Sequence, residues 1–77
     1  MVATRQFSII YMTKNISNLN DFCDFLNSCE EWPIEANSII EKNGWEDLTG
    51  TSYGVCSDGE NKIIIEDNGT YSVIANN

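Results

Sequence analysis

The sequence predicts a single small α+β domain in which an antiparallel sheet carries two helices packed on one face. The chain has 77 residues, enough for one hydrophobic core and no more. Its middle contains two stretches with helical periodicity, and its last third contains three apolar runs separated by Asp-Gly and Asn-Gly dipeptides. We therefore expect one domain, residues 1–77, with the order β-α-α-β-β-β.

The first strand is predicted over residues 6–13, where β-branched and aromatic residues alternate along the chain. Apolar side chains occupy both sets of alternating positions: Phe7, Ile9 and Tyr11 on one, Ile10 and Met12 on the other. A strand that is apolar on both faces is typical of the centre of a sheet. We expect it to join a C-terminal three-stranded meander.

The first helix is predicted over residues 19–29. Its apolar residues recur with the spacing of one helical face: Leu19, Phe22, Cys23 and Leu26. Asn18 precedes this stripe as a natural N-cap, with Asp21 at the third helical position.

The second helix is predicted between Pro33, which suits a first turn, and Gly44, which suits a stop. These residues bracket a short apolar stripe made of Ile34, Ala36, Ile39 and Ile40. Trp32 and Trp45 flank the helix, and for both we favour packing in the core or at a helix end over a role in binding. Residues 46–51 are expected to form a loop.

The last third of the chain predicts two tight hairpins. Asp58-Gly59 and Asn68-Gly69 favour type I′ turns, in which both central residues have positive φ. These turns separate strands over residues 52–57, 60–67 and 70–75. Two-residue loops would place Val55 opposite Lys62, Tyr53 and Val73 opposite Ile64, and Tyr71 opposite Glu66.

This register divides the apolar residues between two faces of the sheet. The face that we expect to form the core carries Tyr53, Val55, Ile64, Tyr71, Val73 and Ala75. The other face carries Gly54, Cys56, Ile63, Ile65, Ser72 and Ile74, and is apolar enough to need a cover or a partner.

The cysteines indicate a reducing, cytoplasmic setting. Their number is odd, with no Cys-x-x-Cys pair, which argues against a secreted disulfide scaffold. Cys23 and Cys29 are about 240° apart around a helix and cannot bridge each other. We expect these two cysteines and the third, Cys56, to serve as small apolar residues of the core. The N-terminus does not have the pattern of a signal peptide, and no apolar run is long enough to span a membrane.

Catalytic and metal-binding patterns are missing from the sequence. The chain contains no histidine, which is the commonest general base and metal ligand. Its three scattered cysteines do not have the spacing of a zinc site, and no glycine-rich phosphate loop occurs. We therefore expect a protein that is not an enzyme and that uses no cofactor or metal.

Acidity is the most distinctive feature. Twelve acids face four bases, a formal net charge of −8 and a sequence pI of about 4.1. Direct binding to nucleic acid is excluded, because phosphate contacts need clustered Lys and Arg. Half of the acids are explained as helix-dipole partners or turn residues. These six are Asp21, Glu30, Glu31, Glu35, Asp58 and Asp67.

Three of the remaining acids, Glu41, Glu46 and Asp47, lie at or beyond the end of the second helix, where the dipole disfavours negative charge. This cluster is where we first expect a partner. The full set of candidate partner-binding residues is Asp24, Glu30, Glu31, Glu41, Glu46, Asp47, Glu60, Glu66 and Trp45.

These features favour a small inhibitor of a basic protein that handles nucleic acid, with carboxylates standing in for phosphates. The general character is similar to that of phage-encoded inhibitors such as anti-CRISPR and anti-restriction proteins, without a matching motif. An immunity protein or antitoxin that neutralises a basic toxin nuclease is an alternative. Another is a homo-oligomeric module that uses the Ile63–Ile65–Ile74 face, and acidity that serves only solubility is a third.

Overall fold

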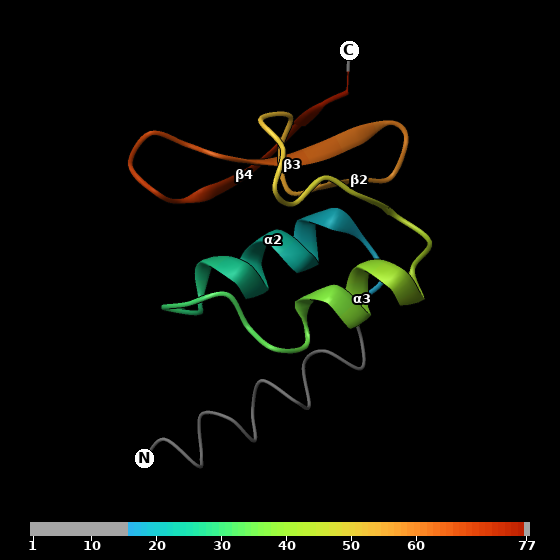
Figure 1. The fold of residues 1–77 in the computed structure, drawn as a ribbon, viewed down its shortest axis with the longest axis horizontal. Helices are drawn as coiled ribbons and strands as arrows, with labels where there is room; N and C mark the ends of the chain where they lie inside the picture. The colour runs from blue at the N-terminus through green and yellow to red at the C-terminus, as the bar shows by residue number, and fades with distance from the viewer. Residues whose placement is uncertain (1–15, 77) are drawn as a thin grey trace.

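The computed structural model describes residues 16–76, so the strand predicted over residues 6–13 lies outside the described part. The elements are α2 (Leu19–Asn27), α3 (Ala36–Lys42), β1 (Glu46–Asp47), β2 (Cys56–Ser57), β3 (Asn61–Ile65) and β4 (Tyr71–Ala75). The strands form one antiparallel sheet in the order β1-β2-β3-β4. Both helices lie on the same side of the sheet, which confirms the α+β class (Figure 1).

Helix α2 forms where its local signals predict. The Asn18 side chain accepts a hydrogen bond from the backbone N–H of Asp21 at 2.8 Å, as expected of an N-cap. The helix ends at Asn27, two residues before the predicted end. Its buried residues are Leu19, Phe22, Cys23, Phe25 and Leu26, and the helix packs against β3 and β4.

Helix α3 is shorter than predicted. The carbonyl of Pro33 accepts the Ala36 N–H at 3.2 Å in a single turn, and regular helix begins only at Ala36. Ile34 therefore precedes the helix and is 90% exposed, so its predicted place on the buried stripe is wrong. The stripe is limited to Ala36, Ile39 and Ile40.

Strand β1 replaces the first part of the predicted loop over residues 46–51. Glu46 lies opposite Ser57 and Asp47 opposite Cys56. Two consecutive acids have no strand pattern of their own, and their extended conformation comes from backbone pairing with β2. Within residues 16–76, β1 is therefore an additional strand that pairs with the first of the three predicted C-terminal strands.

The two hairpin turns are not type I′. Gly59 and Gly69 have positive φ, but Asp58 and Asn68 do not. Instead, the Asp58 carboxylate accepts the backbone N–H groups of Glu60 and Asn61, at 2.9 and 2.8 Å. The side-chain oxygen of Asn68 similarly accepts the N–H of Thr70 at 3.1 Å. These side-chain bonds stabilise other turn geometries, because Asp and Asn can cap backbone groups two residues further on.

The altered turns change the register. In the β2–β3 pair, Cys56 lies opposite Ile63, where the predicted register places Asn61. This shift of two residues leaves the faces of both strands matched as predicted.

In the β3–β4 pair, Ile63 lies opposite Val73, where the sequence predicted Ile64, a shift of one residue. A shift of one residue moves every side chain of a strand to the other face. Ile63, expected on the second face, therefore shares a face with Val73 and Tyr71 and is fully buried in the core. Tyr53, expected in the core, lies before β2 and is 68% exposed.

The predicted apolar face of Ile63, Ile65 and Ile74 does not exist. Ile63 is in the core, and Ile65 shares its side of the sheet because side chains alternate along a strand. Ile74 is paired with Lys62 and therefore points to the opposite side. The three residues cannot form one interface for a homo-oligomer.

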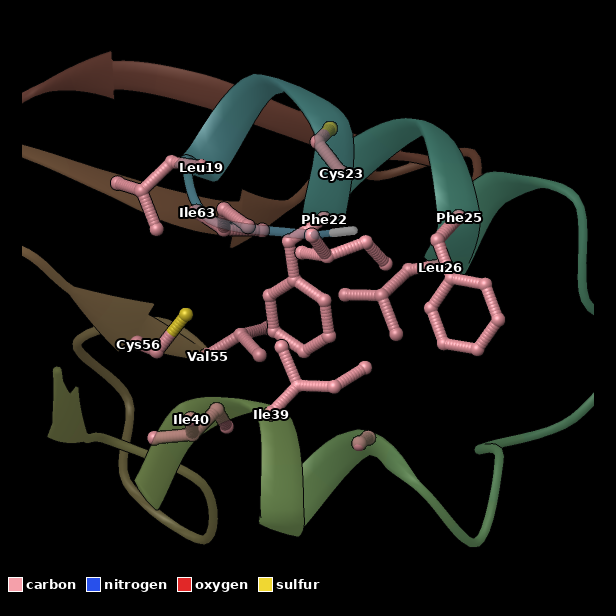
Figure 2. Packing of buried hydrophobic residues seen from close by; sticks show 12 residues of the cluster. Leu19, Phe22, Cys23, Phe25, Leu26, Ile39, Ile40, Val55, Cys56 and Ile63 are labelled. Carbon is pink, nitrogen blue, oxygen red and sulfur yellow. The ribbon is translucent and has the colours of Figure 1, made fainter. Parts of the chain in front are cut away.

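The core lies between the sheet and the two helices. Side chains from α2, α3 and the strands converge there, with Phe22 at the centre of the view (Figure 2). Phe22 lies 6.3 Å from Phe25 and 5.7 Å from Trp45, measured between ring centroids. Among the described residues, the largest fully buried side chains are Phe22, Phe25, Leu26, Ile63 and Cys56.

Candidate functional site

The acidic side chains all lie at the surface. None of the twelve is buried, and only Glu35 is half-buried. Residues 16–76 contain all twelve acids and two lysines, Lys42 and Lys62, which gives the described part a formal charge of −10. Because the acids are exposed to solvent, their charges create a negative field around the molecule. This field attracts cationic surfaces.

One group of acids gathers where α3 ends and the sheet begins. We call it the β1 acidic end, and it comprises Glu41, Glu46, Asp47, Asp58 and Glu60. The N–H of Trp45 donates to the Ile40 carbonyl at 3.1 Å, which brings β1 against the last turn of α3. Pairing then sets Glu46 opposite Ser57, the residue before Asp58. The end of α3 and the β2–β3 turn lie on the same side of the molecule (Figure 1).

Two carboxylates of the β1 acidic end are held in place by hydrogen bonds. Asp47 Oδ1 accepts the N–H and the hydroxyl of Thr49, at 2.9 and 2.6 Å. These bonds lower the pKa of Asp47, and the bonds from Asn61 and Glu60 lower the pKa of Asp58. Each bond is made to the charged form, which it therefore favours. Both side chains are ionised and fixed in direction at neutral pH.

Cys56 lies opposite Asp47 in the sheet and two residues before Asp58, and the charges of both carboxylates affect the pKa of its thiol. Burial raises the pKa of its thiol to about 12, and the negative charges of Asp47 and Asp58 contribute to the rise. The pKa of Cys23 is raised as well, by burial and then by Asp24. Neither thiol is a candidate nucleophile, because the thiolate is the reactive form. The prediction that these two cysteines act as core residues is confirmed.

A second group of acids lies at the other end of the sheet. Glu66 and Asp67 belong to the β3–β4 turn, and Glu30 and Glu31 follow the C-terminal end of α2. These two places lie on the same side of the molecule (Figure 1), because Asn27 at the end of α2 is hydrogen-bonded to the backbone of Tyr71 in β4. The predicted partner-binding residues are thus divided between two ends, with Asp24 exposed on α2 between them.

Trp45 packs on the core. It is half-buried beside Phe22, so the packing role favoured from the sequence is confirmed, while its contact with a partner stays a prediction. The structure instead exposes two apolar residues, Trp32 and Ile34, that were not among the predicted partner-binding residues. Trp32, for which packing was also favoured, is 40% exposed and lies two residues before the strongly exposed Ile34. The available signal was Pro33, which lets a turn precede the regular helix.

Within residues 16–76, no three Cys, Asp or Glu side chains come together as ligands for a metal ion. The helices of the same region are too short to cross a membrane. The chain matches none of the protein-family models, curated proteins or solved structures with which it was compared.

Proposed function

We propose that this chain is a small, non-enzymatic binding protein that inhibits a basic protein partner, one that handles nucleic acid. The observation that carries the proposal is the charge of −10 on the described part, spread over surface positions of a packed scaffold. A groove that binds phosphates presents Lys and Arg at close spacing, and carboxylates can pair with the same groups. Such a protein inhibits by occupying the groove.

The β1 acidic end supports this proposal through its geometry. Neighbouring strands lie about 4.8 Å apart, so the pairing of β1 with β2 brings Glu46 and Asp47 close to the strand that leads into the turn of Asp58. Asp47 and Asp58 are already oriented by hydrogen bonds, so they lose little side-chain entropy on binding. The surrounding negative field raises the rate of encounter with a cationic partner.

The experiment starts from the full chain, used as bait in the cells that express it, and continues with the captured partner in purified form. We expect binding that weakens steeply as salt is raised, because the contacts are ionic. Reversing four charges together, Glu30→Lys, Glu31→Lys, Glu46→Lys and Asp47→Lys, should weaken binding by about 100-fold or more. Each pair reversed separately shows which end of the domain makes the contact.

Lysozyme, which is basic but handles no nucleic acid, controls for non-specific attraction. Equal affinity for lysozyme and for the captured partner would contradict the proposal, as would four-fold charge reversal without effect in a variant that melts like the wild type. A partner that is a toxin nuclease would identify the inhibitor as an immunity protein.

A further inference from the structure

The segment that joins the two helices, residues 30–35, presents apolar side chains to solvent. We call it the helix connection. Ile34 is 90% exposed, more than any other large apolar residue within residues 16–76, and Trp32 is 40% exposed. Isolated apolar residues on a surface are ordinary, but a large aromatic and a β-branched residue within three positions form a local concentration. Pro33 between them restricts the backbone.

Both ends of the helix connection are attached to the core. Before it, the N–H of Cys29 donates to the Leu26 carbonyl at 3.1 Å, and the half-buried Cys29 side chain packs against the core. After it, the fully buried Ala36 donates its N–H to the Pro33 carbonyl. A short segment held at both ends is preorganised, which reduces the entropy lost when it binds.

Acidic residues surround the apolar pair. Glu30 and Glu31 precede Trp32, and Glu35 follows Ile34, so the six residues contain three acids and no base. An apolar centre with a charged rim is the usual composition of a binding hot spot, and Trp is among the residues most enriched there. The charge also limits the occupant. A second copy of the chain would bring six glutamates together, and an anionic membrane surface would be repelled.

We propose that the helix connection is a docking segment, in which Trp32 and Ile34 enter an apolar pocket bordered by Lys or Arg on a protein partner. The proposal rests on the proposed function, which requires the partner to be positively charged. It adds an apolar contact, and it assigns that contact to the end of the domain that carries Glu30 and Glu31. The charge reversal of Glu30 and Glu31 should then weaken binding more than that of Glu46 and Asp47.

The decisive variants change Ile34, whose exposure makes an effect on folding small. With the purified partner, Ile34→Ser should raise Kd by about tenfold or more, because a buried Ile side chain contributes on that scale. Ile34→Val should stay within about threefold of the wild type. Tyr53→Ser removes a larger exposed side chain, in the loop between β1 and β2, and should leave Kd unchanged.

A photo-crosslinking residue at position 34 should attach to a partner surface rich in Lys and Arg, and one at position 53 should not. If Ile34→Ser binds like the wild type while four-fold charge reversal abolishes binding, the docking segment is refuted and the proposed function stands. If charge reversal has no effect but Ile34→Ser does, the ionic function fails instead.

A third experiment tests whether the helix connection is accessible in the unbound protein. In the Trp45→Phe variant, fluorescence reports Trp32 alone. If Trp32 in the monomer is shielded from quenching by acrylamide, residues 1–15 cover the segment; if sedimentation shows a dimer, a second copy covers it. Either result would refute the docking segment.

Discussion

The side-chain amide of Asn27 pairs with both backbone polar groups of Tyr71, 44 positions along the chain. Its Nδ2 donates to the Tyr71 carbonyl at 3.0 Å, and its Oδ1 accepts the Tyr71 N–H at 2.8 Å. The amide thereby supplies the bonds that a neighbouring strand would make. This contact joins the end of α2 to the beginning of β4, and so brings the β3–β4 turn to the end of the domain where the helix connection begins.

Replacing Asn27 tests how much this contact stabilises the fold. Asn27→Ala removes both bonds, and we expect the free energy of unfolding to fall by about 1–3 kcal/mol in chemical denaturation. Asn20→Ala, at an exposed position of the same helix, should be neutral or slightly stabilising, because Ala is the better helix former. Equal effects of the two substitutions would mean that the paired amide contributes nothing. Asn27→Asp keeps the acceptor but not the donor, and should lie between.

Gly54 lies where the chain passes close to β3. A Cβ added there would meet the Ile63 carbonyl oxygen at 2.6 Å, and the φ of Gly54 is +145°. Gly54→Ala should therefore destabilise the fold by about 3 kcal/mol or more, from backbone strain and the contact together. Gly59 also has a positive φ, but a Cβ added there would meet no atom within 4 Å. Gly59→Ala should therefore lower the free energy of unfolding by only about 1 kcal/mol. Thermal melting of both variants against the wild type measures the difference.

The cysteines should react with iodoacetamide in an order set by burial. Cys29 is half-buried, whereas Cys23 and Cys56 are buried and burial raises the pKa of both thiols, that of Cys56 to about 12. In the folded chain we expect Cys29 to be modified first, and Cys56 only on unfolding. Mass spectrometry of the peptides after timed labelling gives the order, and labelling in denaturant shows that all three can react. Early modification of Cys56 would contradict the described core.

Asp47 gives the fold a dependence on pH through Thr49. The Thr49 hydroxyl is the largest cause of the lowered pKa of Asp47, which is normally 3.8. Because the folded pKa is below the unfolded one, the stabilisation is present above pH 3.8 and is lost as pH falls through the folded pKa. In Thr49→Val, the pKa of Asp47 measured by carboxyl NMR should rise. The difference in the free energy of unfolding between this variant and the wild type should become smaller as the pH is lowered.

Thr51→Val is the matched control for this measurement. The Thr51 hydroxyl donates to the Leu48 carbonyl at 2.6 Å in the same loop and does not bond to the Asp47 carboxylate. We expect it to leave the pKa of Asp47 where it is in the wild type. A wild-type Asp47 that titrates at 3.8 or above would contradict the described bonds.

The features that could be predicted from the sequence depend on contacts between near neighbours. Asn18 caps α2, and the stripe that starts at Leu19 gives the helix its buried face. The sequence also indicated Cys23 and Cys56 as core residues and two turns near Gly59 and Gly69. Each of these follows from spacing, conformational preference or composition within a few residues.

The candidate site followed from the sequence only as a set of charges. Glu30 and Glu46 were both expected at a partner surface, but nothing local indicates that they lie at different ends of the domain. Their placement depends on pairing across the sheet and on Asn27 bonding to Tyr71. Ile34 was assigned to a buried stripe because its spacing fits one, and the turn at Pro33 removed it.

By itself, the sequence determined the α+β class, the capped and buried α2, and the acidic character, because these depend on local periodicity and on composition. Only the tertiary structure decided that β1 is a strand, that Ile63 and not Ile64 enters the core, and that Ile34 is exposed. Each of these depends on backbone hydrogen bonds and packing that apolar spacing does not specify. A shift of one residue between strands exchanges the two faces of a sheet.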